Sequence, residues 1–134
     1  MGIIHTVLFR RRVLVVEDSF MLAINAADVL EDAGAHVVGP VATVEQALEL
    51  AASIPLDAAV YNSFLGNTRA DALADFLDRQ GVPSVVLSLI AACDEDPLLR
   101  AHPVIQWPFD PNHLIAALSS AVIQRRCRAR LSAN

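Results

Sequence analysis

The chain has 134 residues, of which 54% are hydrophobic and 19% charged, and its formal net charge at pH 7 is −5. A chain of this length can bury one hydrophobic core, so we expect one domain. The acidic balance argues against nucleic acid as a partner, and the longest apolar stretch, residues 85–93, is too short to cross a bilayer. We therefore expect a soluble cytoplasmic protein that binds neither nucleic acid nor a membrane.

Short apolar runs alternate with segments of helical periodicity along most of the chain. The predicted strands are residues 13–16, 36–41, 58–61, 84–89 and 104–106. Helices are predicted from Ser19 to Gly34, from the capping box Thr43–Gln46 onward, over 69–80, as a short or irregular segment within 91–102, and from Asp110 onward. Five strand–helix pairs with short connections predict an α/β domain, a doubly wound five-stranded parallel sheet with helices on both faces.

The domain boundaries follow from these elements. Residues 1–11 are predicted to be an N-terminal extension, 12–130 the folded domain and 131–134 a C-terminal tail. A dinucleotide site would need closely spaced glycines after the first strand, where Glu17-Asp-Ser19 stands instead, and the sequence has no Walker motif.

The cysteines and the polar residues show no pattern of an enzyme. Cys93 and Cys127 match neither a disulfide framework nor a metal-ligand spacing, so we expect two free thiols in a reducing compartment. No nucleophile–base pair is evident, and we therefore expect no enzymatic activity.

The most informative stretch is residues 57–66. An apolar run predicts a buried central strand that delivers one polar side chain, Asn62, to a loop at its carboxyl end. Functional sites of open α/β sheets lie at that end. The side chains expected to converge there are Glu17, Asp18, Asn62, Ser88 and Trp107.

In this arrangement the chain resembles the receiver domains of two-component response regulators. Val13–Ser19 (Val-Leu-Val-Val-Glu-Asp-Ser) is similar to the strand that carries the family's acidic pair. Residues 37–48, Gly81–Pro83 and Val104–Asp110 are similar to the short single-domain receivers common in alphaproteobacteria. The resemblance covers nearly everything from Arg12 to the last helix. It implies a flavodoxin-like sheet with strand order 2-1-3-4-5.

The resemblance also assigns roles to the converging side chains. In the family an acidic pair and an acceptor aspartate hold Mg²⁺, a Ser or Thr binds the phosphoryl group, and a lysine pairs with that group. Carried over, the acidic pair is Glu17 and Asp18, the Ser/Thr is Ser88, and the backbone carbonyl that binds the metal belongs to Phe64.

Two positions depart from the family pattern. Asn62 stands at the acceptor position and Trp107 at the lysine position. An acyl phosphate forms on a carboxylate and not on a carboxamide. Losing one carboxylate and one ammonium together leaves the formal charge of the pocket unchanged. This favours the interpretation that the changes at positions 62 and 107 compensate for each other.

We expect no required cofactor and only weak Mg²⁺ binding. Trp107 is interpreted either as filling the phosphate pocket or as a partner-binding anchor.

We therefore predict an atypical receiver that acts by phosphorylation-independent binding to another protein. The expected partner is a histidine kinase or another signalling regulator, and a homodimer would form through the last helix and the fifth strand. Two alternatives stay open: a receiver phosphorylated at a non-standard residue such as Ser63 or Asp57, and a small-ligand module over Asn62.

The end of the last helix is basic. Arg125, Arg126, Arg128 and Arg130 lie there. We interpret them as a solvated helix end favoured by the helix dipole, with a nucleic-acid contact as the alternative.

Overall fold

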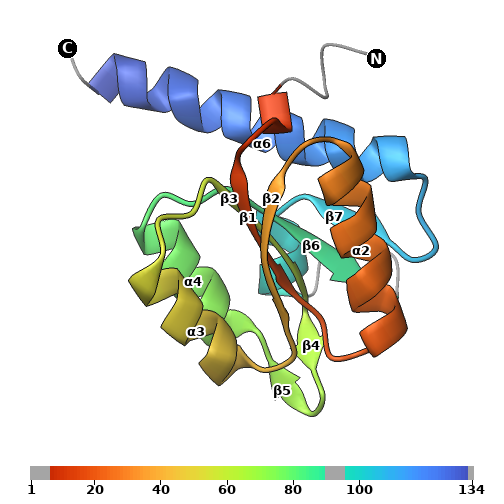
Figure 1. Cartoon of the computed structure of the whole chain (residues 1–134). Coiled ribbons are helices and arrows are strands. Elements are labelled where there is room, and N and C mark those ends of the chain that lie inside the picture. The colour runs from red at the N-terminus through yellow and green to blue at the C-terminus, as the bar shows by residue number, and fades with distance from the viewer. Residues whose placement is uncertain (1–6, 90–95, 133–134) are drawn as a thin grey trace.

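The computed structural model describes residues 7–89 and 96–132. Within these ranges five parallel strands form one sheet in the order β2-β1-β3-β6-β7 (Figure 1). The strands are β1 (Arg12–Val16), β2 (His36–Val41), β3 (Ala58–Asn62), β6 (Ser84–Ser88) and β7 (Val104–Gln106). Numbered among themselves, the sheet strands have the order 2-1-3-4-5, so the predicted fold class is confirmed.

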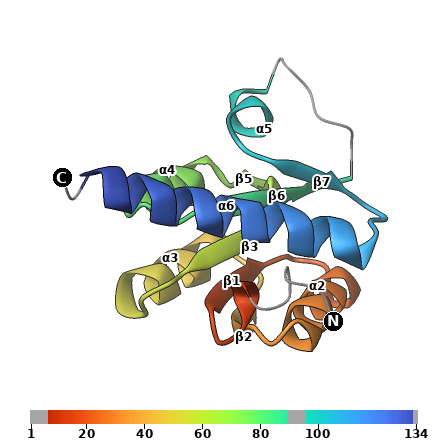
Figure 2. The same cartoon turned by 90° about the horizontal axis from the view of Figure 1, so that it is seen from above.

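Helices cover both faces of the sheet. They are α2 (Phe20–Asp32), α3 (Val44–Ser53), α4 (Asp71–Arg79), α5 (Pro97–Ala101) and α6 (Pro111–Ser132). In Figure 1, α3 and α4 lie to the left of the sheet and α2 to its right, while Figure 2 shows α6 running along the sheet and past it. Among the described residues, no helix is both long and apolar enough to cross a membrane.

The two cores follow from the alternation of side chains along each strand. Leu14 and Val16 pack toward α3, α4 and α5, whereas Val13 and Val15 pack toward α2 and α6. Successive side chains of a strand point to opposite faces, and here both faces are covered. This is why the central strands are continuous apolar runs in the sequence.

Two predicted helix starts are confirmed in detail. The Gln46 backbone N–H donates to Thr43 Oγ1 at 3.2 Å, and Gln46 Oε1 accepts from the Ala42 N–H at 3.1 Å. Asp110 Oδ1 accepts from the Asn112 N–H at 2.9 Å, directly before α6. These bonds satisfy backbone donors that a helix leaves free in its first turn.

The helix predicted over 69–80 begins later, at Asp71, and this correction has a local cause. Residues Phe64–Leu65 (β4) and Thr68–Arg69 (β5) form a small antiparallel hairpin. Gly66 has φ 66° at the first position of the two-residue connection, where tight hairpin turns favour glycine. Two-residue segments are too short to show the alternation that predicts a strand, so the helix was predicted to begin at Arg69.

The predicted extension contributes to the core. Leu8 is fully buried against the α2/α6 face, and the Arg10 N–H donates to the Gly34 carbonyl at 2.8 Å. The domain boundary at Arg12 stays a prediction. Cys127 is an exposed free thiol, while Cys93 lies outside the described residues.

Replacing Leu8 with alanine should lower the free energy of unfolding by about 2 to 5 kcal/mol, because a fully buried leucine would leave a cavity. Urea unfolding followed by circular dichroism measures this. Met21→Ala is the control: its side chain is 80% exposed, so the change should stay within about 0.5 kcal/mol. Equal stability of Leu8→Ala and wild type would show that residues before Arg12 contribute nothing to the fold.

Candidate functional site

Polar side chains from three neighbouring strands meet at the carboxyl edge of the sheet. Glu17 and Asp18 follow β1, Asn62 ends β3 and Ser88 ends β6. They line one cavity of about 470 Å³, together with Phe64 of the hairpin. Parallel strands bring their carboxyl ends to the same edge, and four of the five side chains expected to converge there, those of Glu17, Asp18, Asn62 and Ser88, line this cavity.

The Asn62 side chain is hydrogen-bonded through both of its polar atoms. Its Nδ2 donates to Glu17 Oε2 at 2.9 Å, and its Oδ1 accepts from the Phe64 N–H at 3.0 Å. Asn62 is only 8% exposed. A carboxamide can donate at one atom and accept at the other, whereas an ionised carboxylate can only accept. An ionised aspartate at this position would therefore place a second hydrogen-bond acceptor against Glu17, with no donor between the two.

Backbone N–H groups satisfy the two acidic residues as well. Glu17 Oε1 accepts from the Ser19 N–H at 3.1 Å, and Asp18 Oδ2 accepts from the Gly66 N–H at 2.8 Å. Ser19 occupies the predicted N-cap position of α2, but its side chain makes no capping bond. Ser19, which directly precedes α2, thus contributes its backbone N–H to the site.

The pKa values of the Glu17 and Asp18 carboxyl groups are shifted in opposite directions. Burial raises the pKa of Glu17, and hydrogen bonds from Asn62 and Ser19 offset this only in part. Burial also acts to raise the pKa of Asp18, but hydrogen bonds with Glu17 and from the Gly66 N–H outweigh it and leave the pKa lowered. Burial therefore dominates the pKa of Glu17, whereas the hydrogen bonds taken together dominate the pKa of Asp18.

These residues fit Mg²⁺ poorly. Magnesium takes deprotonated oxygen ligands in near-octahedral geometry. Here burial raises the pKa of Glu17, and the Asn62 amide group points its N–H at the Glu17 carboxylate. Across the described part of the chain, no three His, Cys, Asp or Glu side chains are grouped as a metal site would need. The partial positive charge of the Asn62 N–H faces the Glu17 carboxylate, where a bound cation would otherwise supply positive charge.

Trp107 does not line the cavity. Its ring lies 4.4 Å from the ring of Phe109, centroid to centroid, and packs against the α2/α6 core. Only its backbone reaches the site strands, because the Trp107 N–H donates to the Ser88 carbonyl at 2.9 Å. A bulky apolar ring gains more from this packing than from a polar cavity beside two acids. The Trp107–Pro108 peptide bond is cis.

A clamp made by Arg69 was missed by sequence reasoning. Its guanidinium donates to Asp96 Oδ1 and to Asp71 Oδ2, each at 2.8 Å, and lies 5.2 Å from the centre of the Phe64 ring. Asp96 in turn accepts from the Leu98 N–H in the first turn of α5. The hydrogen bonds from Arg69 hold the pKa of Asp96 below its usual range. The loop after Asn62 is thereby tied to α5.

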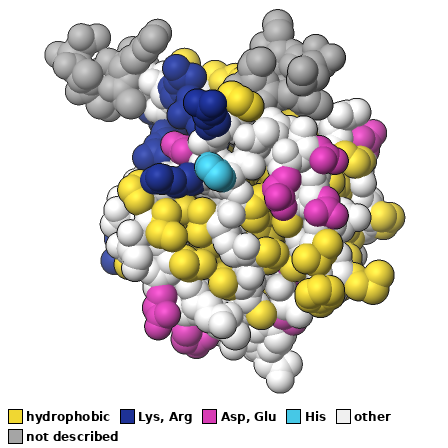
Figure 3. Space-filling view, in the orientation of Figure 1, with side chains coloured by type: hydrophobic (Ala, Val, Ile, Leu, Met, Phe, Trp, Pro, Cys, Tyr) yellow, Lys and Arg dark blue, Asp and Glu magenta, His cyan; other side chains and the backbone are white. Residues whose placement is uncertain are grey.

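Two exposed apolar side chains line the cavity, and two more lie at the start of α2. Phe64 and Leu89 line the cavity and are 46% and 67% exposed. Phe20 and Met21, which follow Ser19, are 78% and 80% exposed. We call these four residues the apolar rim. Hydrophobic side chains gather at the lower right of Figure 3, over the region that α2 occupies in Figure 1. Sequence reasoning considered only the inner face of this helix and so missed the rim.

Comparison with solved structures places this geometry in a known architecture. The chain is similar to the response regulator PhyR from Brucella abortus, with a TM-score of 0.82 at 20% identity over 98% of this chain. It is also similar to SdrG from Sphingomonas melonis, with a TM-score of 0.72 at 29% sequence identity over 87% of this chain. A response regulator receiver protein from Sinorhizobium medicae matches with a TM-score of 0.71 at 23% identity, also over 87% of this chain. The chain has the fold of a receiver domain.

The extent of these matches differs. The chain spans 55% of the PhyR structure but 98% of SdrG and 97% of the Sinorhizobium receiver protein. No model of a known protein family matches the sequence. No curated protein sequence matches it either. Several of the similar solved proteins are named as response regulators or signal receiver domains.

Replacing Asn62 with aspartate should lower the free energy of unfolding by about 1 to 3 kcal/mol at neutral pH without divalent cations, because a buried acceptor would face Glu17 unpaired. Added Mg²⁺ should restore much of this loss, since the variant presents three carboxylates. Urea unfolding with EDTA and with MgCl₂ measures both effects. Asn67→Asp makes the same chemical change at an exposed hairpin position and should show neither. An unchanged stability of Asn62→Asp in EDTA would contradict the role given to the amide.

Removing the clamp should loosen α5. In Arg69→Met, amide exchange of Leu98 and Leu99 should become faster, because Asp96 loses its cationic partner. A carboxyl whose folded pKa lies below its unfolded value stabilises above that unfolded value, and this stabilisation is lost as pH falls through the folded one. The stability difference between wild type and Arg69→Met should therefore be largest above about pH 4 and shrink below it.

Hydrogen exchange and urea unfolding across pH test this. Arg79→Met, at an exposed arginine of α4, is the matched control. Equal exchange of Leu98 and Leu99 in wild type and Arg69→Met would rule out the clamp.

Proposed function

We propose that this chain is an atypical receiver of two-component signalling, and that it acts by binding another protein without being phosphorylated at the usual position. The observation that carries the proposal is the Asn62 carboxamide, hydrogen-bonded to Glu17 and to the Phe64 N–H. Both atoms that could approach a phosphoryl group are engaged, and neither is a carboxylate oxygen.

The groups that would stabilise a transferred phosphoryl group are also weakened here. Phosphoryl transfer depends on positioning and on cations that neutralise charge on the equatorial oxygens. The lysine position holds Trp107, whose ring packs into the α2/α6 core. Asn62 directs an amide N–H at Glu17 at the position where a third carboxylate would otherwise help to bind a metal. An incoming phosphoryl group would meet the negative Asp18 without a compensating cation.

Phosphorylation at Ser63 or Asp57 finds no support. Ser63 lines the Asn62 cavity but is only 4% exposed, so little of its surface is open to a phosphodonor. Asp57 lies before the first residue of β3, at the end of the strand remote from Asn62. Its carboxylate accepts from the Arg12 N–H at 2.9 Å and lies 3.7 Å from Arg11. It therefore serves to join the starts of two strands.

The Arg69 clamp supports a single fixed conformation. It joins the loop after Asn62 to the start of α5 through two hydrogen bonds to Asp96. A charge-assisted pair with this fork geometry is among the stronger protein hydrogen bonds. A phosphorylation switch would need this region to have two arrangements, whereas a constitutive binding module needs one.

The apolar rim supports a protein as the partner. Exposed apolar side chains that gather in one place mark interaction surfaces more often than isolated ones do. In this proposal a histidine kinase or another signalling regulator contacts the rim formed by Phe20, Met21, Phe64 and Leu89. A homodimer through β7 and α6, as predicted from the resemblance, would use a different surface.

Intact mass after incubation with acetyl phosphate and Mg²⁺ tests the proposal. Wild type should gain no phosphoryl group, because Asn62 cannot form an acyl phosphate. The double variant Asn62→Asp, Trp107→Lys restores the two missing groups and should gain one.

The variants distinguish the outcomes. A mass gain on wild type would overturn the phosphorylation-independent mechanism, and peptide mapping would then locate the modified residue. Trp107→Lys alone is the matched control: it restores the cation without the acceptor, and it should gain no mass.

A further inference from the structure

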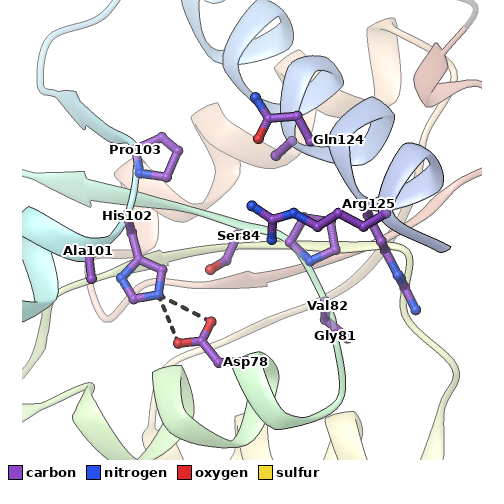
Figure 4. A pocket seen from close by; sticks show the side chains of 12 residues that line it. Asp78, Gly81, Val82, Ser84, Ala101, His102, Pro103, Gln124 and Arg125 are labelled. Atoms are coloured by element: carbon purple, nitrogen blue, oxygen red, sulfur yellow. Dashed lines mark hydrogen bonds and ion pairs between the residues drawn. The ribbon is translucent and has the colours of Figure 1, made fainter. Parts of the chain in front are cut away.

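A second cavity lies at the opposite end of the sheet from Asn62. It has a volume of about 440 Å³ and is lined where β6 begins, at Ser84, whereas the Asn62 cavity is lined where β6 ends, at Ser88. Its walls come from the end of α4, the connection between α5 and β7, and the C-terminal half of α6. Figure 4 shows Gln124 and Arg125 of α6 across from Asp78 and His102.

The single carboxylate among the lining side chains already has a partner. His102 Nε2 lies 3.2 Å from Asp78 Oδ2, and His102 Nδ1 lies 2.9 Å from the Leu98 carbonyl oxygen. The dashed lines in Figure 4 mark the contact between the imidazole and the carboxylate. Asp78 is therefore engaged on one wall and is not paired with the guanidinium groups of the other.

The cations of the cavity have no such partners. Among the side chains that the structure describes, Arg125 and Arg128 have no carboxylate within 4.0 Å. Arg125 Nη1 donates to the Leu56 carbonyl at 3.3 Å. The whole chain carries 15 acidic against 10 basic residues, so two neighbouring arginines without a counter-ion are a local feature. Arginine side chains gather at the upper left of Figure 3, over the region where α6 ends in Figure 1.

We propose that this cavity binds a small molecule carrying a phosphate group. Two guanidinium groups can hold the oxygens of a phosphate through paired hydrogen bonds, and the Gln124 amide adds a further donor. The volume falls in the range of small-molecule sites. A concave site with walls from several elements favours a compact ligand over a nucleic-acid backbone, which would follow an open basic surface.

The experiment is a ¹H–¹⁵N NMR titration of the full chain, including the arginine Nε–H signals, with inorganic phosphate and then AMP. Sodium chloride of equal ionic strength serves as the blank. The proposal expects saturable shifts at His102, Gln124, Arg125 and Arg128. Arg128→Ala should weaken binding roughly tenfold, since one charge-assisted contact is lost. Arg128 has no hydrogen bond or ion pair in the described structure that this change would break.

Arg126→Ala is the matched control. Arg126 is an exposed arginine on the same helix and lies outside the lining, so its removal should leave the affinity unchanged. Equal weakening by Arg126→Ala and Arg128→Ala, or tighter binding of a single-stranded oligonucleotide than of AMP, would overturn the proposal in favour of a general basic surface. Shifts that appear equally in the chloride blank, or no shifts at millimolar phosphate, would also overturn it.

Discussion

The hydrogen bond from Asn62 Nδ2 to Glu17 Oε2 joins the ends of the two central strands and sets the character of the site. A carboxylate in place of the amide would bring two acceptors together and would need a cation between them. The amide removes that need. The same side chain orders the following loop, because its other atom accepts from the Phe64 N–H. The Asn62 side chain therefore pairs with Glu17 inside the cavity and also orders the loop that carries Phe64.

The fold does not depend on the chemistry of this site, because one set of residues specifies the fold and another set forms the site. Alternating apolar side chains such as Val13 and Leu14 build the cores on the two faces of the sheet. The polar groups at the strand ends add little to that packing, so acceptor and lysine can be replaced without loss of architecture. This is consistent with the close structural likeness to receivers at low sequence identity.

Two ends of the same sheet thus acquire different properties. At the carboxyl end, polar atoms are paired with one another and apolar side chains are exposed around them, which suits a protein partner. At the amino end, Arg125 and Arg128 face a cavity whose single lining carboxylate is already engaged, which suits an anion. The long helix α6 forms a wall of that cavity and also packs on the sheet, so it connects the second site to the core.

The sequence by itself determined the strands, the caps at Thr43 and Asp110, and the meeting of Glu17, Asp18 and Asn62, because periodicity and helix signals are local and parallel strands share an edge. Only the tertiary structure decided the rest. The direction of the Trp107 ring, the partners of Arg69 and the position of Arg125 away from any described carboxylate depend on side chains distant in sequence, and no spacing encodes those distances. The burial of Leu8 likewise depends on its packing in the core that α2 and α6 form with the sheet.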